Sequence, residues 1–236
     1  MAANICIIPA RGGSKRIPRK NIRAFCGRPI LEYSVEAALQ SGCFDEVMVS
    51  TDDPEIAEVA RSAGAHVPFL RSDQHSNDHA MTADVLLEVL EAYRAQNRTF
   101  EIGCCLYPCA PLVTAPRLKA CLEQMQSDAT VEGVIPIVPF SYPIQRALTV
   151  VDHRVRMIQP ENQNIRSQDL VATYHDAGQF YWFRIARFLE LGGKSMALLR
   201  RAPLVLREME VQDIDTEEDW EVAELKYRLL MKEKSQ

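Results

Sequence analysis

ICIIPARGGSKRIPRKNIR, residues 5–23, reads as a buried strand that runs into a loop rich in positive charge. The apolar run of residues 5–8 is ended by Pro9, and the pair Gly12 and Gly13 follows. A short apolar run bounded by proline and glycine is typical of a fully buried strand in a parallel sheet. Ligands of open α/β sheets bind beyond the carboxyl ends of such strands, so we expect a ligand beside these glycines.

Positive charge is concentrated in the same stretch. The chain has 27 Lys and Arg against 32 Asp and Glu, yet seven of the cations precede Glu32, the first acidic residue. Gathering like charges costs self-repulsion, and a polyanionic ligand is the usual reason to keep them together. Glycines let backbone N–H groups turn towards an anion, Lys15 offers a compact charge, and the fork of Arg11 matches two phosphate oxygens.

The stretch therefore predicts a phosphate-binding loop, with a solvated basic loop as the alternative. It contains neither a GxGxxG nor a GxxxxGK[ST] pattern. The dinucleotide and Walker fingerprints are thereby excluded, and a nucleotide has to be held in another way.

Composition limits the class of protein. With 236 residues, 47% of them hydrophobic, the chain is long enough to bury one core with an appendage. An isoelectric point near 5.6 argues against general nucleic-acid binding. No apolar run approaches 18 residues and no secretory layout opens the chain, so we expect no membrane span.

The seven cysteines are odd in number and form no CxxC pair. Several lie within apolar runs, which favours reduced thiols in the core of a cytoplasmic protein. Metal sites at Cys104, Cys105 and Cys109, or at His75 and His79, are the alternatives.

Apolar runs and helical periods alternate along the chain, which predicts a mainly parallel sheet covered on both faces, a three-layer Rossmann-like α/β fold. Thr216 is expected to cap the last helix, with Asp219 completing a capping box. The expected helices are residues 29–41, 55–63, 82–94, 116–125 and 216–230, and the later strands are 46–50, 66–70, 102–107, 131–138, 179–183 and 204–207.

The alternation stops near Pro139. Residues 147–151 and 155–158 read as short strands, and polar sequence follows them. We therefore expect an inserted hairpin and arm over residues 139–173, within an α/β domain formed by residues 1–138 and 174–236. A disordered loop is the alternative.

Asp213 and Asp215 form a second chemical cluster. Residues two apart in an extended segment project to the same side, so both carboxylates would face one way while Ile214 points into the core. Adjacent carboxylates repel each other unless a cation lies between them, and Mg²⁺ prefers oxygen ligands that include phosphates. The spacing alone leaves two readings open, a magnesium site and a solvated acidic stretch before a helix.

The segment ARGGSKRIPRKN, residues 10–21, resembles the N-terminal signature of the sugar-acid cytidylyltransferases, the family of the CMP-sialic acid synthetases. The resemblance covers about residues 4–230 and is weakest across 139–173. It implies a fold of the nucleotide-diphospho-sugar transferase type. It also implies transfer of CMP from CTP to the anomeric hydroxyl of a nonulosonic acid, Mg²⁺ on Asp213 and Asp215, and a homodimer contact made by the arm.

The same resemblance implies the role of each site residue. Arg11, Lys15, Lys20 and Asp215 would be catalytic, the three cations by offsetting charge on the departing pyrophosphate. The residues implied to bind the nucleotide are Ala10, Arg11, Gly12, Gly13, Asn21, Arg71 and Thr82.

The sugar acid is indicated by two further segments, YPCAPL at residues 107–112 and YHDAGQFYW at residues 174–182. Sialic acid members read QPTSPL at the first, so Tyr107 argues against sialic acid. Together the segments look most like the branch that acts on pseudaminic acid, a substrate used in bacterial glycan biosynthesis such as flagellin glycosylation. By that resemblance, Tyr107, His175, Asp176 and Gln179 line the sugar-acid pocket.

The alternative substrates are sialic acid, legionaminic acid and 3-deoxy-manno-octulosonate. From a different class, the alternative is a non-catalytic nucleotide-binding regulator.

Overall fold

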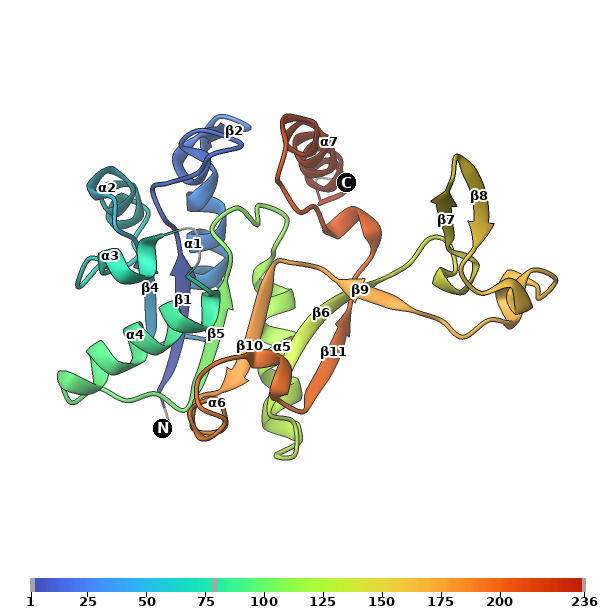
Figure 1. Cartoon of the computed structure of the whole chain (residues 1–236). Helices are drawn as coiled ribbons and strands as arrows, with labels where there is room; N and C mark the ends of the chain where they lie inside the picture. The colour runs from blue at the N-terminus through green and yellow to red at the C-terminus, as the bar shows by residue number, and fades with distance from the viewer. Residues whose placement is uncertain (1–2, 78–79, 235–236) are drawn as a thin grey trace.

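The strand predicted at residues 5–8 is β1 (Asn4–Pro9), which lies inside a seven-stranded sheet. The computed structural model describes residues 3–77 and 80–234. β1 pairs in parallel with both of its neighbours, β4 (Glu46–Ser50) and β5 (Ile102–Leu106). The carboxyl ends of these three strands therefore meet at one edge of the sheet, at the top of Figure 1.

The other half of the sheet contains the strands that follow the insertion. β11 (Arg201–Val205) runs parallel to β6 (Gly133–Pro139). β10 (Phe180–Arg184) lies antiparallel between β5 and β6, and β9 (Tyr174–Asp176) pairs antiparallel with β6. The prediction of a mainly parallel sheet is confirmed, and β10 and β9 are its reversed members because the chain re-enters the sheet beside the end of β6.

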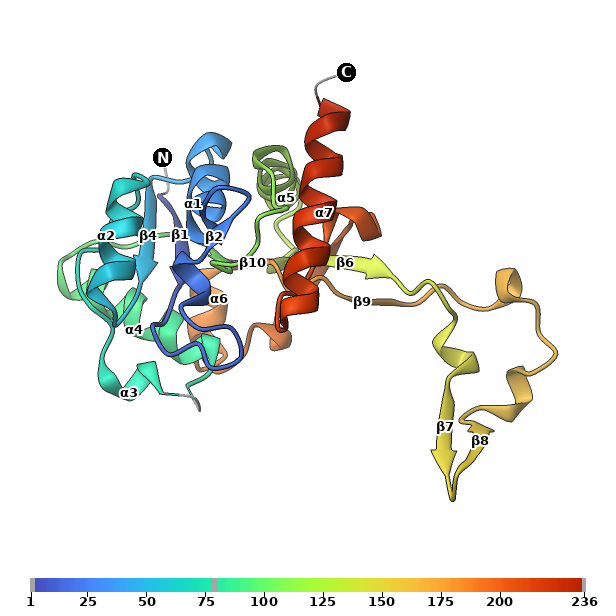
Figure 2. The same cartoon turned by 90° about the horizontal axis from the view of Figure 1, so that it is seen from above.

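Helices cover both faces of this sheet, as Figures 1 and 2 show. Cys6 and Ile8 of β1 pack towards one face and Ile5 and Ile7 towards the other, as the alternation of a strand requires. The first face is covered by α1 (Ile30–Ser41), α2 (Pro54–Ser62) and α5 (Ala115–Ser127), and the second by α4 (Thr82–Ala95) and α6 (Ile185–Glu190).

The C-terminal helix α7 (Glu217–Lys234) packs over the top edge of the sheet through a small separate core. Its start has the predicted capping box: Asp219 N–H donates to Thr216 Oγ1 (3.2 Å), and Thr216 N–H donates to the Asp219 carboxylate (2.8 Å). The core joins this helix to the basic segment and consists of Ile17, Phe25, Ile30, Tyr33, Ile214, Trp220 and Ala223.

Two sequence expectations need correction. Residues 66–70 were expected to form a strand, but only an isolated bridge between Met48 and His66 is present, because Pro68 has no N–H to extend the ladder. The short elements β2 (Ala24–Phe25), β3 (Arg28–Pro29) and α3 (Asp73–Ser76) were not expected, since each is too brief to show a period.

Residues 139–173 leave the sheet after β6 and return at β9 (Figures 1 and 2). They carry a hairpin of β7 (Leu148–Val151) and β8 (Arg154–Met157), turned through Asp152 and His153 with positive φ values of 50° and 57°. The arm stands away from the α/β domain, so its apolar side chains face solvent.

Across the described ranges, 3–77 and 80–234, no helix has the length and apolar character needed to cross a bilayer.

Candidate active site

A hollow of about 450 Å³ lies beyond the carboxyl ends of β1 and β5, where the sequence predicts a ligand. Its wall brings together residues from the basic loop, from the start of the segment after β5, and from the acidic segment before α7. The lining includes Arg11, Ser14, Lys15, Arg16, Lys20, Asn21, Tyr107, Cys109, Gly178, Asp213 and Asp215.

The basic loop is held in shape by side chains beneath it. Asn21, which is buried, donates to the carbonyl oxygen of Arg11 (2.8 Å). The thiol of Cys109 in turn donates to Asn21 Oδ1 (3.1 Å), although the motif gave no reason to include this cysteine. The backbone N–H of Gly12 donates to Asp52 (2.9 Å), so the turn of the loop is fixed from two sides.

Arg19 holds the far end of the loop. It has a left-handed backbone with φ of 56°, which is unusual for a side chain other than glycine. Its guanidinium pairs with the carboxylates of Asp53 and Glu55 at the start of α2. The Arg19 guanidinium lowers the pKa of Asp53 below its ordinary value. These ion pairs give a physical reason for the strained backbone to persist.

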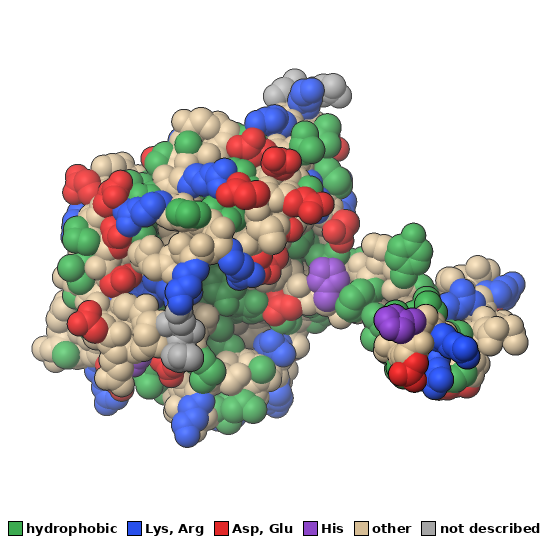
Figure 3. Space-filling model, turned by 45° about the horizontal axis from the view of Figure 1, so that its top comes forward, with side chains coloured by type: hydrophobic (Ala, Val, Ile, Leu, Met, Phe, Trp, Pro, Cys, Tyr) green, Lys and Arg blue, Asp and Glu red, His purple; other side chains and the backbone are tan. Residues whose placement is uncertain are grey.

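Cations and carboxylates meet across the hollow. Lys20 Nζ donates to the carbonyl oxygen of Ile214 (2.6 Å) and lies 3.8 Å from Asp215 Oδ1. Arg16 donates to the same oxygen of Asp215 at 2.7 Å. Figure 3 shows basic and acidic side chains interspersed over the top of the α/β domain, without a broad field of one sign.

Asp213 lies beside a second carboxylate, that of Asp215, at the wall of the hollow. Partial desolvation at the wall of the hollow, and then the neighbouring charge of Asp215, raise the pKa of Asp213 above its ordinary value, although the residue remains exposed to solvent. A divalent ion between the two would remove that repulsion. The described residues contain no group of three or more His, Cys, Asp or Glu side chains that could hold a metal. The two carboxylates therefore fit Mg²⁺ only as a partial set, completed by phosphates and water, which is the way this ion usually binds.

Arg71 and Thr82 lie outside the described lining of the hollow. Arg71 is buried, where Nε donates to Ser50 Oγ (3.0 Å) and a terminal nitrogen donates to the carbonyl oxygen of Ser50. Burial lowers the pKa of this guanidinium below its ordinary value. Thr82 begins α4, and its hydroxyl lies 3.2 Å from the hydroxyl of Tyr107, which does line the hollow.

Of the four residues expected to hold the sugar acid, only one lines the hollow. Tyr107 lines the hollow, whereas His175, Asp176 and Gln179 lie outside its described lining. Gln179 is buried and donates to the carbonyl oxygen of Glu210 (2.9 Å).

Asp176 and His175 also have partners within the protein. Asp176 accepts from the N–H of Gly178 (2.8 Å) and from the hydroxyl of Tyr181 (2.9 Å). The ring of His175 packs against Phe140, with the ring centres 5.1 Å apart. Tyr181 was not expected, because in the sequence it reads as one of several aromatics of a buried strand.

The alternative prediction of a metal site at the three cysteines is wrong. Cys104 and Cys105 are fully buried in adjacent positions of β5, facing opposite sides of the sheet, while Cys109 faces the hollow. His75 lies 3.3 Å from a carboxylate oxygen of Glu88. His79 lies outside the described residues, so the alternative pair cannot be placed.

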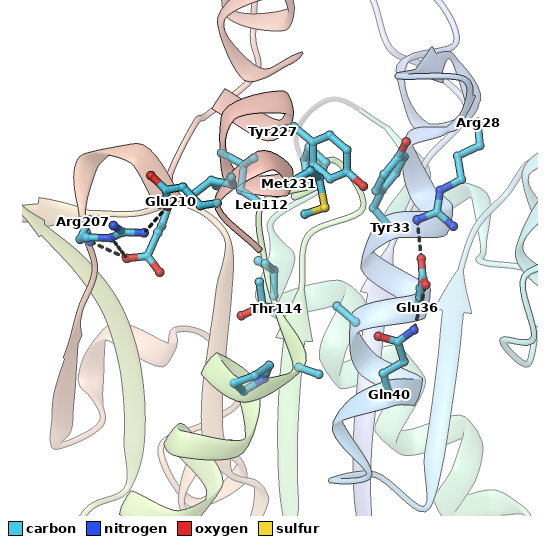
Figure 4. A pocket seen from close by; sticks show the side chains of 17 residues that line it. Arg28, Tyr33, Glu36, Gln40, Leu112, Thr114, Arg207, Glu210, Tyr227 and Met231 are labelled. Atoms are coloured by element: carbon cyan, nitrogen blue, oxygen red, sulfur yellow. Dashed lines mark hydrogen bonds and ion pairs between the residues drawn. The ribbon is translucent and has the colours of Figure 1, made fainter. Parts of the chain in front are cut away.

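A second hollow, of about 440 Å³, lies between α1 and α7. Figure 4 shows Tyr33 of α1 and Tyr227 and Met231 of α7 beside it. Its charged groups are already paired with each other, Arg28 with Glu36 and Arg207 with Glu210. It therefore has no unneutralised cationic surface for a triphosphate, and the first hollow remains the candidate active site.

The family model described as "Cytidylyltransferase" matches residues 5–223 of the chain. This range begins at the strand before the basic loop and ends within α7, so it includes both clusters of the hollow.

Individual proteins are similar over almost the same length. Pseudaminic acid cytidylyltransferase from Campylobacter jejuni subsp. jejuni serotype O:2 is 42% identical over 227 residues, which cover 96% of this chain and 97% of that protein. The CMP-N,N'-diacetyllegionaminic acid synthase of Legionella pneumophila subsp. pneumophila is 31% identical, covering 93% and 94%.

Among solved structures, a CMP:2-keto-3-deoxy-manno-octonic acid synthetase complexed with CTP superposes with a TM-score of 0.71. The match covers 98% of this chain and 100% of that one at 20% identity. Likeness at this identity shows the fold, and it confirms the predicted α/β architecture.

Proposed function

Because the chain belongs to the cytidylyltransferase family, as its N-terminal segment predicted, we propose that it transfers CMP from CTP to the anomeric hydroxyl of pseudaminic acid. The products would be CMP-pseudaminate and pyrophosphate. In such a transfer the hydroxyl attacks the α-phosphorus while pyrophosphate leaves, so positioning and neutralisation of charge dominate the work of the protein.

The observation that carries the proposal is the meeting of Lys20 and Asp215 in one hollow, with Lys15 and Arg11 on the same wall. Phosphates need cations, and a metal that touches phosphates needs carboxylates. We assign Arg11, Lys15 and Lys20 to the charge of the departing pyrophosphate.

Asp213 and Asp215 would hold Mg²⁺ in this assignment. When bound, the ion supplies positive charge at the phosphate oxygens, which a pair of carboxylates alone would repel. The residues of the chain contribute the remaining electrostatics: Lys20 stays beside the acidic segment through its bond to the carbonyl oxygen of Ile214, and the side chain of Asn21 donates to the carbonyl oxygen of Arg11 and neutralises that partial charge.

Two facts support pseudaminic acid among the nonulosonic acids. The similarity to a pseudaminic acid cytidylyltransferase, at 42% identity, exceeds the 31% to a legionaminic acid synthase. Tyr107 also presents a phenol to the hollow, already in contact with Thr82, where the sialic acid motif has an amide.

We also propose that the arm makes a homodimer contact. Its hairpin exposes Leu148, Val150, Val151 and Val155, a group of apolar side chains that a monomer would leave in water. The cytoplasm would be the compartment, because all seven cysteines are free thiols.

Pyrophosphate release from CTP and Mg²⁺ with a panel of sugar acids tests the function. We expect turnover with pseudaminic acid to exceed that with sialic acid, legionaminic acid and 3-deoxy-manno-octulosonate by at least about tenfold. Equal or greater turnover with another acid would overturn the assignment of pseudaminic acid as the substrate. Absence of CTP consumption with every acid would overturn the proposed CMP transfer itself.

A further inference from the structure

We propose that Arg16 is an exchangeable counter-ion of the acidic segment. It neutralises Asp215 in the ligand-free protein and moves to the phosphates of the nucleotide when a divalent cation takes its place. The inference rests on the proposed function, because it assumes that Asp213 and Asp215 hold that cation.

The contact between Arg16 and Asp215 is short and uses a carboxylate oxygen of a proposed metal ligand. Arg16 donates to Asp215 Oδ1 at 2.7 Å, closer than Lys20, whose amine is 3.8 Å from the same oxygen. In the described part of the chain Arg16 makes no other hydrogen bond. One oxygen of a proposed metal ligand is therefore taken by this guanidinium in the free protein.

Arg16 is free to leave and Lys20 is not. The Arg16 side chain is 68% exposed, whereas that of Lys20 is 23% exposed and is fixed by its 2.6 Å bond to the carbonyl oxygen of Ile214. The next residue, Ile17, is buried in the core beneath α7 and anchors the backbone. Arg16 can therefore change its rotamers without moving the loop.

The guanidinium and a divalent cation cannot share Asp215 Oδ1 without strong repulsion. Mg²⁺ binds carboxylate oxygens directly at about 2.1 Å, inside the space that a donor at hydrogen-bond distance requires. Arg16 lines the same hollow as Lys15 and Arg11, so its fork stays within the region where phosphates would lie. Guanidinium groups bind two phosphate oxygens at once, which favours this second position once a nucleotide is present.

The exchange predicts opposite effects on two binding steps. We would measure Mn²⁺ binding to the nucleotide-free protein by electron paramagnetic resonance, and CTP binding with saturating Mg²⁺ by calorimetry without sugar acid. Arg16→Gln and Arg16→Met should bind Mn²⁺ at least about threefold more tightly than wild type, the scale of a half-exposed ion pair. Both should bind CTP at least about threefold more weakly, because one phosphate partner is lost.

Arg23→Gln is the matched control. Arg23 belongs to the same basic stretch but pairs with Glu217, which is not a proposed ligand, so both affinities should stay within about twofold of wild type. A similar change in this control would mean that only net charge matters and would overturn the inference. Thermal unfolding verifies that each variant is folded, and Arg16→Met keeps the aliphatic stem in case Arg16→Gln is unstable.

Two further results would overturn the exchange. Unchanged Mn²⁺ affinity in both Arg16 variants would show that the guanidinium does not compete with the cation. Tighter Mn²⁺ binding with unchanged CTP affinity would show that Arg16 does not move to the phosphates. If wild type binds Mn²⁺ and consumes CTP in either case, the proposed function stands; if it does neither, the proposed function fails as well.

Discussion

The amine of Lys20 lies 3.8 Å from a carboxylate oxygen of Asp215, so the basic loop near the start of the chain touches the acidic segment near its end. The contact is supported from below, where Ile17 of the loop and Ile214 of the acidic segment pack with Trp220 of α7. The small core sets the distance between the cations and the carboxylates, and the chemistry of the hollow depends on it.

Asp215→Asn should lower kcat by at least about 10²-fold while it leaves the fold intact. The amide keeps the shape of the side chain but removes the charge on which Arg16, Lys20 and the proposed metal depend. Steady-state pyrophosphate release and thermal unfolding would be measured together.

Glu217→Gln is the control for Asp215→Asn. Glu217 is an exposed carboxylate two residues after Asp215, and it pairs with Arg23. Glu217→Gln should retain kcat within about threefold. Normal turnover of Asp215→Asn would show that the Asp215 carboxylate takes no part in the reaction.

Asp213→Asn should raise the Tm of the ligand-free protein while it abolishes turnover. Partial desolvation at the wall of the hollow and the charge of Asp215 raise the pKa of Asp213 in the folded state above its ordinary value. The folded protein then holds this proton more tightly than the unfolded chain. The free energy of unfolding therefore falls as pH rises from the unfolded pKa through the folded one.

The neutral amide of Asp213→Asn should avoid that loss. Because water screens an exposed carboxylate, we expect a Tm higher by only about 1 °C at pH 7 and little difference below the unfolded pKa of about 3.9. Differential scanning calorimetry at pH 3.5 and pH 7 would show whether the gain depends on pH in this way. A variant less stable than wild type at pH 7 would contradict the predicted direction of the change in Tm.

Local pattern was enough to predict most of the fold and the two charged clusters. Residues 5–23 contain the strand, the glycines and the cations in one stretch, and Asp213 and Asp215 show their shared orientation by spacing alone. The capping box of Thr216 and Asp219 was likewise readable, because its partners are three residues apart.

Contacts between distant segments could not be predicted. Cys109 donates to Asn21 across 88 residues, and Lys20 donates to the carbonyl oxygen of Ile214 across 194 residues. The antiparallel direction of β10 follows from where the arm returns to the sheet, and no periodicity within residues 179–183 encodes it.

Gly12→Ala should lower the free energy of unfolding of the ligand-free protein, whereas Gly13→Ala should not. A Cβ on Gly12 would lie 2.8 Å from a carboxylate oxygen of Asp53 and 3.0 Å from the Cβ of Asp53. The side chain of Asp53, which pairs with Arg19, therefore has to shift. A Cβ on Gly13 meets nothing within 4 Å among the described residues. We expect a loss of about 1–3 kcal/mol for Gly12→Ala, measured by urea unfolding.

Gly13→Ala serves as the matched control, and any loss of activity in it at unchanged stability would indicate close approach of the nucleotide to that backbone. Equal stability of the two variants would show that the space beside Gly12 is not restrictive.

Lys15→Ala should reduce kcat/KM for CTP by about 10²-fold, with Tm within about 2 °C of wild type. The reason is that Lys15 lines the hollow, where its charge would meet the phosphates. Lys119→Ala, on an exposed position of α5, is the control and should behave as wild type. Parallel losses of activity and stability in Lys15→Ala would indicate a structural role for the loop instead.

The exposed hairpin of the arm should hold two copies of the chain together. Val150 and Val155 face each other across β7 and β8 and are 69% and 65% exposed, so they form one apolar patch that water would otherwise cover. Light scattering after gel filtration should give the mass of a dimer for the wild type. The double variant Val150→Glu/Val155→Glu should give a monomer, because two carboxylates per copy would be buried without partners. Leu225→Glu, which changes an exposed apolar side chain on α7, should remain dimeric. A monomeric wild type, or a double variant that stays dimeric, would assign the arm to some other role.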